Sequence, residues 1–283
     1  MAHLLQDKYS KLIDKKLQAT LVTKSGFIFN DHCEGDAAGG KVKIPVRSTD
    51  VVVGDYDKTN GMDLSSGSTS YIDLDLNYDK AVNEIIDGYD KNAVPDDIVA
   101  ERLDSAGYAL GVAEDTISIK ALENEGTVYE DTSEVTVENV YDTIVSLRTK
   151  LSEKNVPTND RWIIVSPKVY GLLLKDTTNF IRQGELSENL IANGAVGRIA
   201  GFNVFESSLL ANEDESTQEG KTVTTEMIVG HPLWCHRVEA WSVPVGVKDL
   251  TNTYIGACAV QGRKIFGVKI SNKDAVIVKR FEA

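Results

Sequence analysis

Residues 95–124 read PDDIVAERLDSAGYALGVAEDTISIKALEN, a pattern that predicts one long helix. Proline suits the first turn of a helix, and the two aspartates after it suit the positive end of the helix dipole. Apolar side chains recur at alternating steps of four and three residues, at Val99, Leu103, Ala106, Leu110, Ala113 and Ile117. At 1.5 Å per residue the helix would be about 45 Å long, so it would act as a structural spine.

The sequence after the spine predicts a mixed region of helices and strands. A second helix is expected from Thr136 to a stop at 155–157, followed by a buried strand at 161–167 and a helix at 168–175. Six strand-like runs come next, at 202–205, 226–229, 235–243, 254–260, 264–270 and 275–280. Between them, 211–225 reads as an acidic surface loop.

Before the spine, two runs alternate apolar and polar residues, which is typical of half-buried strands. Val42, Ile44 and Val46 are the apolar members of the first run, and the second has Ile72, Leu74, Leu76 and Tyr78. In an antiparallel pair the basic side chains of the first run could face the acidic side chains of the second: Lys41, Lys43 and Arg47 against Asp73, Asp75 and Asp79.

The segment 48–70 between these runs is rich in glycine and serine and too polar to pack a core of its own. The two runs therefore predict a long hairpin. An isolated two-stranded ribbon is marginally stable in water, so it should lie on another surface, and a second copy of the chain is a natural candidate.

Charge is spread unevenly along the 283 residues, whose formal net charge is −13. Residues 1–24 contain five lysines and two aspartates, whereas 87–138 contain 14 acidic and three basic residues. From residue 261 onward, six basic residues oppose two acidic ones. These could be three solvated faces of one chain. Alternatively, the positive ends of one copy could complement the negative middle of another, which would steer association.

Several classes of protein are disfavoured by composition. The acidic balance argues against sequence-independent binding of nucleic acid by the chain as a whole. Three cysteines cannot form a disulfide framework. We find no apolar run of about 18 residues, and the polar N-terminus lacks the apolar region of a signal peptide.

Motifs for catalysis or cofactor binding are weak. His231, Cys235 and His236 match no zinc spacing, and adjacent strand residues such as Cys235 and His236 point to opposite faces. The glycine-rich run 194–201 is neither a phosphate-binding loop nor a dinucleotide fingerprint, and a turn between helix and strand is expected there. No Gly-x-Ser-x-Gly elbow occurs. We therefore expect no enzymatic activity, no cofactor and no metal site.

The order of the elements and five short stretches resemble the major capsid proteins of tailed bacteriophages with the HK97-type fold. The stretches are GKVKIPV (40–46), DY (55–56) with the glycines that follow it, AVNEIIDGYD (81–90), RWIIVSPKVY (161–170) and GRIAGFNVFES (197–207). They are similar to the entry and turn of the family's extended loop, the approach to its spine helix, and two parts of its axial domain.

The resemblance implies an α+β, HK97-like capsid fold. Its expected parts are an N-terminal arm at 1–38, an extended hairpin loop at 39–80, a peripheral domain with the spine helix at 81–135, an axial domain at 136–250, and strands returning to the peripheral domain at 251–283. The basic arm also carries Leu12, Ile13 and Leu17, which suggest a short amphipathic helix.

The implied function is a major capsid protein that self-assembles, as pentamers and hexamers, into the icosahedral head shell of a virion. Scaffold and portal proteins and enclosed double-stranded DNA would be its partners, without a membrane, and assembly would take place in the host cytoplasm. The sequence starts directly with the arm, so a separate scaffold or removal of a longer leader is expected. Candidate contacts between subunits are Lys41, Lys43, Arg47, Asp73, Asp75, Lys15 and Lys16.

Two alternatives remain open at this point. An encapsulin-like compartment shell would share the fold but would need a groove for a cargo peptide. A soluble α/β enzyme would need a concave site with convergent polar residues, and the sequence offers neither feature.

Overall fold

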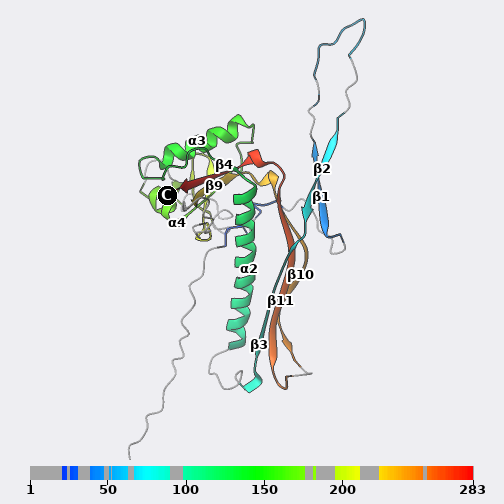
Figure 1. Ribbon diagram of the computed structural model, residues 1–283, viewed down its shortest axis with the longest axis vertical. Helices are drawn as coiled ribbons and strands as arrows, with labels where there is room; N and C mark the ends of the chain where they lie inside the picture. The colour runs from blue at the N-terminus through cyan, green and yellow to red at the C-terminus, as the bar shows by residue number, and fades with distance from the viewer. Residues whose placement is uncertain are drawn as a thin grey trace, which may run out of the picture.

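The computed structural model shows an elongated chain with a hairpin that projects from its body (Figure 1). The described residues are 21–23, 26–30, 39–47, 51, 53–62, 67–89, 98–175, 181–182, 195–210, 223–250 and 254–282, with the backbone alone at 47 and 181–182. The helix expected within the first 20 residues lies outside them, as does most of the expected loop at 211–225.

A long antiparallel sheet forms the shaft of the molecule. Among the described strands, it has the order β10-β11-β3, with bounds Cys235–Asp249, Cys258–Ile270 and Tyr78–Ile86. The strand-like runs expected at 254–260 and 264–270 join into one continuous strand, β11, which begins only at Cys258, so the start predicted at residue 254 was too early. Gly262 does not interrupt it, because its backbone stays paired with Val82 of β3.

Helix α2 (Ile98–Glu125) runs along this sheet and confirms the predicted spine over its described residues. Ala106 is buried and packs with the half-buried Val99 and Leu103 against strands of the sheet. Toward its C-terminus the buried face of the helix moves to four residues outside the predicted stripe: Asp115, Ser118, Ile119 and Leu122. The stripe prediction was therefore incomplete, since a second surface covers this end of the helix.

The second sheet lies at one end of the shaft. Within the described residues it has seven strands in the order β4-β12-β9-β5-β8-β7-β6. Their bounds are Thr127–Val128, Val276–Glu282, Val223–Gly230, Trp162–Val165, Phe202–Glu206, Ala195–Ile199 and Ile181–Arg182. Short 3-10 turns, η2 (Pro232–Trp234) and η3 (Lys273–Ala275), precede β10 and β12.

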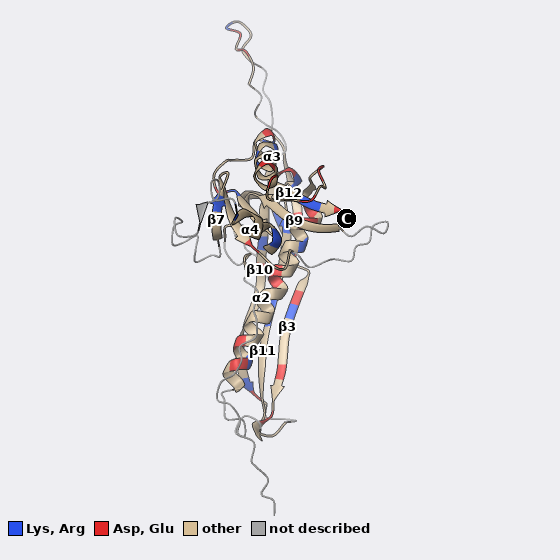
Figure 2. Ribbon diagram, turned by 90° about the vertical axis from the view of Figure 1, so that its left-hand side faces the viewer, with Lys and Arg blue, Asp and Glu red and all other residues tan. Residues whose placement is uncertain are grey.

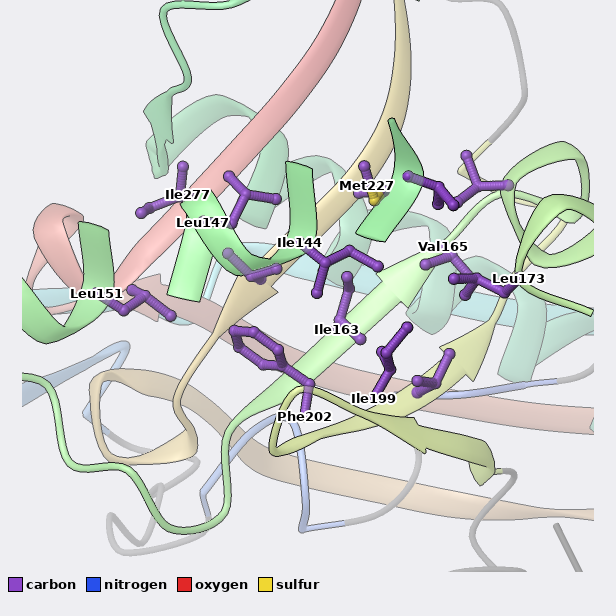
Figure 3. Close-up of a cluster of buried hydrophobic side chains, with 14 of the residues drawn as sticks. Ile144, Leu147, Leu151, Ile163, Val165, Leu173, Ile199, Phe202, Met227 and Ile277 are labelled. Atoms are coloured by element: carbon purple, nitrogen blue, oxygen red, sulfur yellow. The ribbon is translucent and has the colours of Figure 1, made fainter. Parts of the chain in front are cut away.

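Both faces of this sheet are covered by other parts of the chain. Strand β5 shows this, since all four of its residues are buried. Ile163 and Val165 point into one cluster with helices α3 (Val140–Glu153) and α4 (Pro167–Leu173), which Figure 3 shows. Trp162 and Ile164 belong to the opposite cluster, together with the C-terminal part of α2 and with Val22, Ile28 and Phe29. The two sheets therefore share this second cluster.

Helix α3 begins at Val140 and not at the predicted Thr136. Val137, which the prediction placed inside the helix, precedes it and is exposed, whereas Val140 and Ile144 are fully buried. The predicted stop is confirmed, because Asn155 adopts a positive φ of 57° directly after the last turn. No helix among the described residues is both long and apolar enough to cross a membrane.

The turn expected over 194–201 is mostly wrong. Residues 195–199 form strand β7, and the turn is confined to Ala200 and Gly201, with φ values of 46° and 84°, before β8. Side chains of β7 alternate, with Ala195, Gly197 and Ile199 buried, which places the segment inside the sheet. Residue 194 lies outside the described residues.

The hairpin is formed by β1 (Lys41–Arg47) and β2 (Thr69–Asp75), which pair antiparallel as predicted. The second alternating run does not continue through Tyr78 as one strand. It breaks at residues 76–77, and Tyr78 starts β3 in the shaft, where it pairs with Phe266.

Sheet membership differs from two of the expected domain ranges. β10 falls in the range expected for the axial domain, but it is a strand of the shaft. β12 falls in the range expected to return to the peripheral domain, but it pairs with β9 in the seven-stranded sheet. The chain thus crosses between the two sheets more often than a division into consecutive ranges allows.

Candidate functional site

The base of the hairpin carries the charged faces that the sequence predicted. Lys41 is opposite Asp75 in the register and Lys43 is opposite Asp73. Lys41 Nζ lies 3.1 Å from Asp75 Oδ1 and 3.8 Å from Asp73 Oδ2. The hydrogen bond to Asp75 raises the pKa of Lys41. These groups are exposed, so the pairs fix the register of the ribbon more than they stabilise the chain.

The predicted partnership between this basic face and Asp79 is wrong. Asp79 belongs to β3, where Arg263 Nε donates a hydrogen bond to its Oδ1 at 2.9 Å and lowers its pKa. The Arg263 guanidinium also stacks over Trp241, 5.4 Å from the ring centroid. Arg47 is opposite Thr69, and its side chain is not among those described, while Lys15 and Lys16 lie outside the described residues altogether.

The inner face of the hairpin base is apolar and packs on the shaft. Ile44 and Leu74 form a buried cluster with Val238 of β10. β2 also approaches β11 closely, because a Cβ on Gly267 would lie 2.4 Å from the carbonyl oxygen of Asp75. The base of the ribbon is thus anchored to its own chain.

The outer part of the hairpin has no such support from the described residues. Val51, Val53 and Tyr56 are 87%, 92% and 74% exposed on the segment that projects beyond the body (Figure 1). The end of the segment is nevertheless ordered by its own turn. Asp57 Oδ1 accepts a hydrogen bond from Thr59 N at 2.8 Å, which lowers the pKa of Asp57.

The same turn is closed by a second side-chain contact and by backbone pairing. Asn60 Nδ2 donates to Asp57 Oδ2 at 2.8 Å, and Gly61 N donates to the Asp57 carbonyl at 2.8 Å. Gly61 has a φ of 77°, which favours glycine. The hairpin therefore presents apolar side chains on a ribbon whose tip has a defined shape.

A second contact region centres on Asp115, where residues 21–23 lie against α2. We call the described residues 21–23 and 26–30 the arm root, and sequence reasoning did not reveal this contact. Asp115 is 2% exposed and accepts hydrogen bonds from Val22 N at 2.8 Å, Thr23 N at 3.1 Å and the Thr23 hydroxyl. Burial raises the pKa of this carboxyl group. Asp115 lies outside the apolar stripe of the spine, so only the tertiary position of residues 21–23 reveals its role.

Asn30 fixes the other end of the arm root on η2 and β10. Its Nδ2 donates to Pro232 O at 2.7 Å, and its Oδ1 lies 3.0 Å from His236 Nδ1. The backbone of Asn30 also bridges His236 in parallel. One member of the sequence's His/Cys cluster, His236, therefore helps to hold Asn30 in place.

Cys235 and His231, the other members of that cluster, are held by packing and hydrogen bonds within the fold. Cys235 is fully buried, and burial raises the pKa of its thiol. His231 Nδ1 accepts a hydrogen bond from Leu233 N at 3.2 Å, and the ring lies edge-on to Trp234. Within the part of the chain that the structure describes, no three His, Cys, Asp or Glu side chains converge as a metal site would require.

Charged side chains link α2 to the shaft. Lys264 Nζ lies 2.9 Å from Glu114 Oε2 and 2.8 Å from Glu239 Oε2, and Arg237 Nε lies 3.3 Å from Glu114 Oε1. Glu114 is only 16% exposed, so this network is partly shielded from solvent. The spine and the sheet beneath it are therefore held by charge as well as by apolar packing.

Three comparisons with known proteins extend this picture. A family model described as phage capsid protein matches residues 78–278, which include the spine and strands of both sheets. Comparison with curated protein sequences gives no match. The capsid of cyanophage P-SCSP1u is structurally similar, with 13% identity, a TM-score of 0.73, and 98% of this chain and 92% of that chain covered.

Two further solved structures have the same arrangement. One, from Mycobacterium phage Che8, has 18% identity and a TM-score of 0.76, with 98% of this chain and 97% of that chain covered. The other, the capsid of an empty GTA particle computed with C5 symmetry, has 14% identity and a TM-score of 0.68, with 99% and 96% covered. These matches confirm the α+β, HK97-type fold that the resemblance predicted. The chain belongs to the phage capsid protein family.

Proposed function

We propose that this chain is the major capsid protein of a tailed phage, and that copies of it close into an icosahedral head shell around double-stranded DNA. The observation that carries the proposal is the projecting hairpin. Val51, Val53 and Tyr56 are exposed on a ribbon that, among the described residues, is supported only at its base. Apolar side chains of this kind gain stability when a neighbouring copy covers them.

The hairpin base supplies the polar part of this contact. Lys41, Asp73 and Asp75 are exposed and charged, and Lys43 is exposed on the same ribbon. We propose these residues as contacts to the neighbouring subunit, together with Arg47 of β1 and with Lys15 and Lys16 of the basic arm. Exposed charges of both signs can set the register between copies and steer their encounter.

Pentamers and hexamers of the chain are the assembly units that we propose, with scaffold and portal proteins as partners in the host cytoplasm. The division into arm, hairpin loop, peripheral domain and axial domain is proposed as the framework of these contacts. The chain would enclose DNA without binding its sequence and without catalysing a reaction. With a net charge of −13, the protein would adhere only weakly to packaged DNA.

Negative-stain electron microscopy of the purified full chain tests assembly directly. We expect closed shells of uniform size, and small particles at every protein concentration and salt concentration would overturn the proposal. Expression with scaffold, portal and packaging proteins then tests the contents. Nuclease-resistant DNA inside the shells supports a phage head, whereas shells that enclose only protein would favour an encapsulin-like compartment.

A further inference from the structure

The turn at the end of the hairpin, residues 57–61, contains an Asn-Gly pair. Asn60 is exposed and Gly61 is half-buried. Beyond its two chain neighbours, a Cβ on Gly61 would meet no atom within 4 Å among the described residues. Figure 2 shows the end of the hairpin beyond the body of the molecule, with acidic and basic residues close to its tip. No packed side chain of the described chain therefore shields the peptide bond between these two residues.

The shape of the turn depends on this pair. Gly61 has a φ of 77°, which side chains rarely adopt, so the position favours glycine. Asn60 Nδ2 donates a hydrogen bond to Asp57 Oδ2 at 2.8 Å, so the amide before the glycine closes the turn. A glycine also hinders least the approach of its own backbone nitrogen to the preceding side-chain amide. The residues that shape the tip are therefore also those that make Asn60 prone to lose its amide group.

The closed turn restrains this reaction. The attacking atom would be Gly61 N, which donates to the Asp57 carbonyl oxygen at 2.8 Å. The leaving atom would be Asn60 Nδ2, which is held by the Asp57 carboxylate. Both hydrogen bonds must break before Gly61 N can reach Asn60 Cγ. They lie on a two-stranded ribbon whose outer part has no support from the other described residues, so local opening costs little free energy.

We propose that Asn60 is a site of spontaneous deamidation, which proceeds when the tip turn opens and which the contacts of Asp57 slow. Gly61 N forms a bond to Asn60 Cγ, the bond between Cγ and the side-chain nitrogen breaks, and ammonia leaves with the proton of the Gly61 amide. Water then opens the five-membered imide ring. The products are aspartate and isoaspartate at position 60.

The product cannot restore the turn. A carboxylate at position 60 would face Asp57 Oδ2, to which the amide of Asn60 now donates. Hydrogen bonds from Thr59 and Asn60 lower the pKa of Asp57, so this group is ionised at neutral pH and the two like charges would repel. Isoaspartate also lengthens the backbone by one carbon atom. Free subunits would therefore lose the shape of the tip with age. Only the consequence for assembly rests on the proposed function, whereas the deamidation does not.

Peptide mass mapping of the full chain, incubated in mildly alkaline buffer, tests the reaction. We expect Asp57→Ala to deamidate at Asn60 several-fold faster than wild type, because the side-chain contacts of the turn are lost. Asp55→Ala removes the same charge from an exposed position on the same ribbon and should react at the wild-type rate. Wild type unfolded in guanidinium chloride gives the rate of a fully open turn. The other Asn-Gly pair, 193–194, lies outside the described residues and is followed in its own peptide.

Two outcomes would overturn the proposal. No conversion of Asn60 in the native chain, while the unfolded chain converts, would mean that the turn stays closed. Equal rates in wild type and Asp57→Ala would mean that Asp57 does not control the reaction.

Assembly tests the consequence of the added charge. Asn60→Asp carries the product's carboxylate, and Asn60→Ser removes the amide without adding a charge. We expect shell yield to be several-fold lower for Asn60→Asp than for Asn60→Ser, with equal melting temperatures of the monomers. Equal yields would overturn the part assigned to repulsion. If wild type itself forms no shells, the proposed function fails, and mass mapping of the monomer still decides whether Asn60 deamidates.

Discussion

Leu74 of the hairpin packs against the backbone of Gly267 in the shaft, where a Cβ would lie 2.6 Å from Leu74 Cδ2. The same Cβ would be still closer to the Asp75 carbonyl oxygen. Since backbone atoms cannot rotate away, the absence of a side chain at position 267 sets how the hairpin leaves the body. The projecting ribbon is thus oriented by a contact far from its tip.

Replacing Gly267 by valine should displace the hairpin base. We expect the free energy of unfolding to fall by about 1–3 kcal/mol, because overpacking forces the backbone of β2 outward. Urea denaturation of the monomer measures this loss. Gly171→Ala in α4 is the control, since a Cβ there meets no atom within 4 Å among the described residues and alanine suits a helix better than glycine, so this variant should be at least as stable as wild type. Equal stability of both variants would contradict the packing.

The spine offers a second test of packing. Leu110 faces β11, where its Cδ1 would lie 3.1 Å from a Cβ on Gly262. Leu110→Asp should destabilise the chain by about 2–4 kcal/mol, because it places a charge in an apolar contact. Ala109→Asp, one residue away on the exposed side of α2, should change stability little. Thermal unfolding followed by circular dichroism compares the two, and a wild-type melting temperature in Leu110→Asp would reject the assignment.

The spine also shows what periodicity can and cannot predict. Steps of three and four residues located α2 and its face toward the sheet, because both follow from local helix geometry. They could not reveal Asp115, whose burial depends on Val22 and Thr23 more than 90 residues earlier in the sequence. A buried carboxylate has no periodic signal, so its partners become visible only when the fold brings them together.

The hairpin shows the same limit in a strand. Alternation predicted β1 and β2 and a basic face opposite an acidic one, because both follow from the period of two, whereas the register that puts Lys41 opposite Asp75 is known from the structure alone. It could not predict that the second run ends at residue 75 and that Asp79 joins another sheet. Asp79 keeps the alternation but meets Arg263, since a break of two residues turns the chain into the shaft.

Deleting the hairpin tip, residues 54–68, should leave a folded monomer that forms no stable shells. The described residues of this segment are mostly exposed and contribute nothing to the buried clusters. Circular dichroism and size-exclusion chromatography measure folding, and electron microscopy measures assembly. A full-length variant with Val51, Val53 and Tyr56 changed to serine separates loss of apolar contact from loss of length. An insoluble deletion variant without helical signal would show that the tip supports its own chain.

The arm root should respond to pH through Asp115. Burial raises the pKa of this group above the ordinary aspartate value of 3.8, so the folded chain holds the proton more tightly than the unfolded chain. The resulting stability is fully present below the unfolded pKa and is lost as the pH rises through the folded pKa. Urea midpoints of wild type and Asp115→Asn, measured from about pH 4 to pH 7, isolate this effect. We expect wild type to lose stability relative to the variant as the pH rises, and a constant difference would contradict it.

Lys43 tests whether the charged ribbon acts between copies. Lys43→Gln removes a charge from an exposed position without placing like charges opposite each other, so the melting temperature of the monomer should change by no more than about 2 °C. Shell yield should fall at low salt, because the lysine would then be missing from a contact with the neighbouring subunit. Light scattering during assembly measures the effect, with Lys150→Gln on the exposed side of α3 as the control. Because salt screens charges between subunits, the two variants should converge at high ionic strength. Identical assembly of Lys43→Gln and wild type at low salt would limit the role of Lys43 to the hairpin itself.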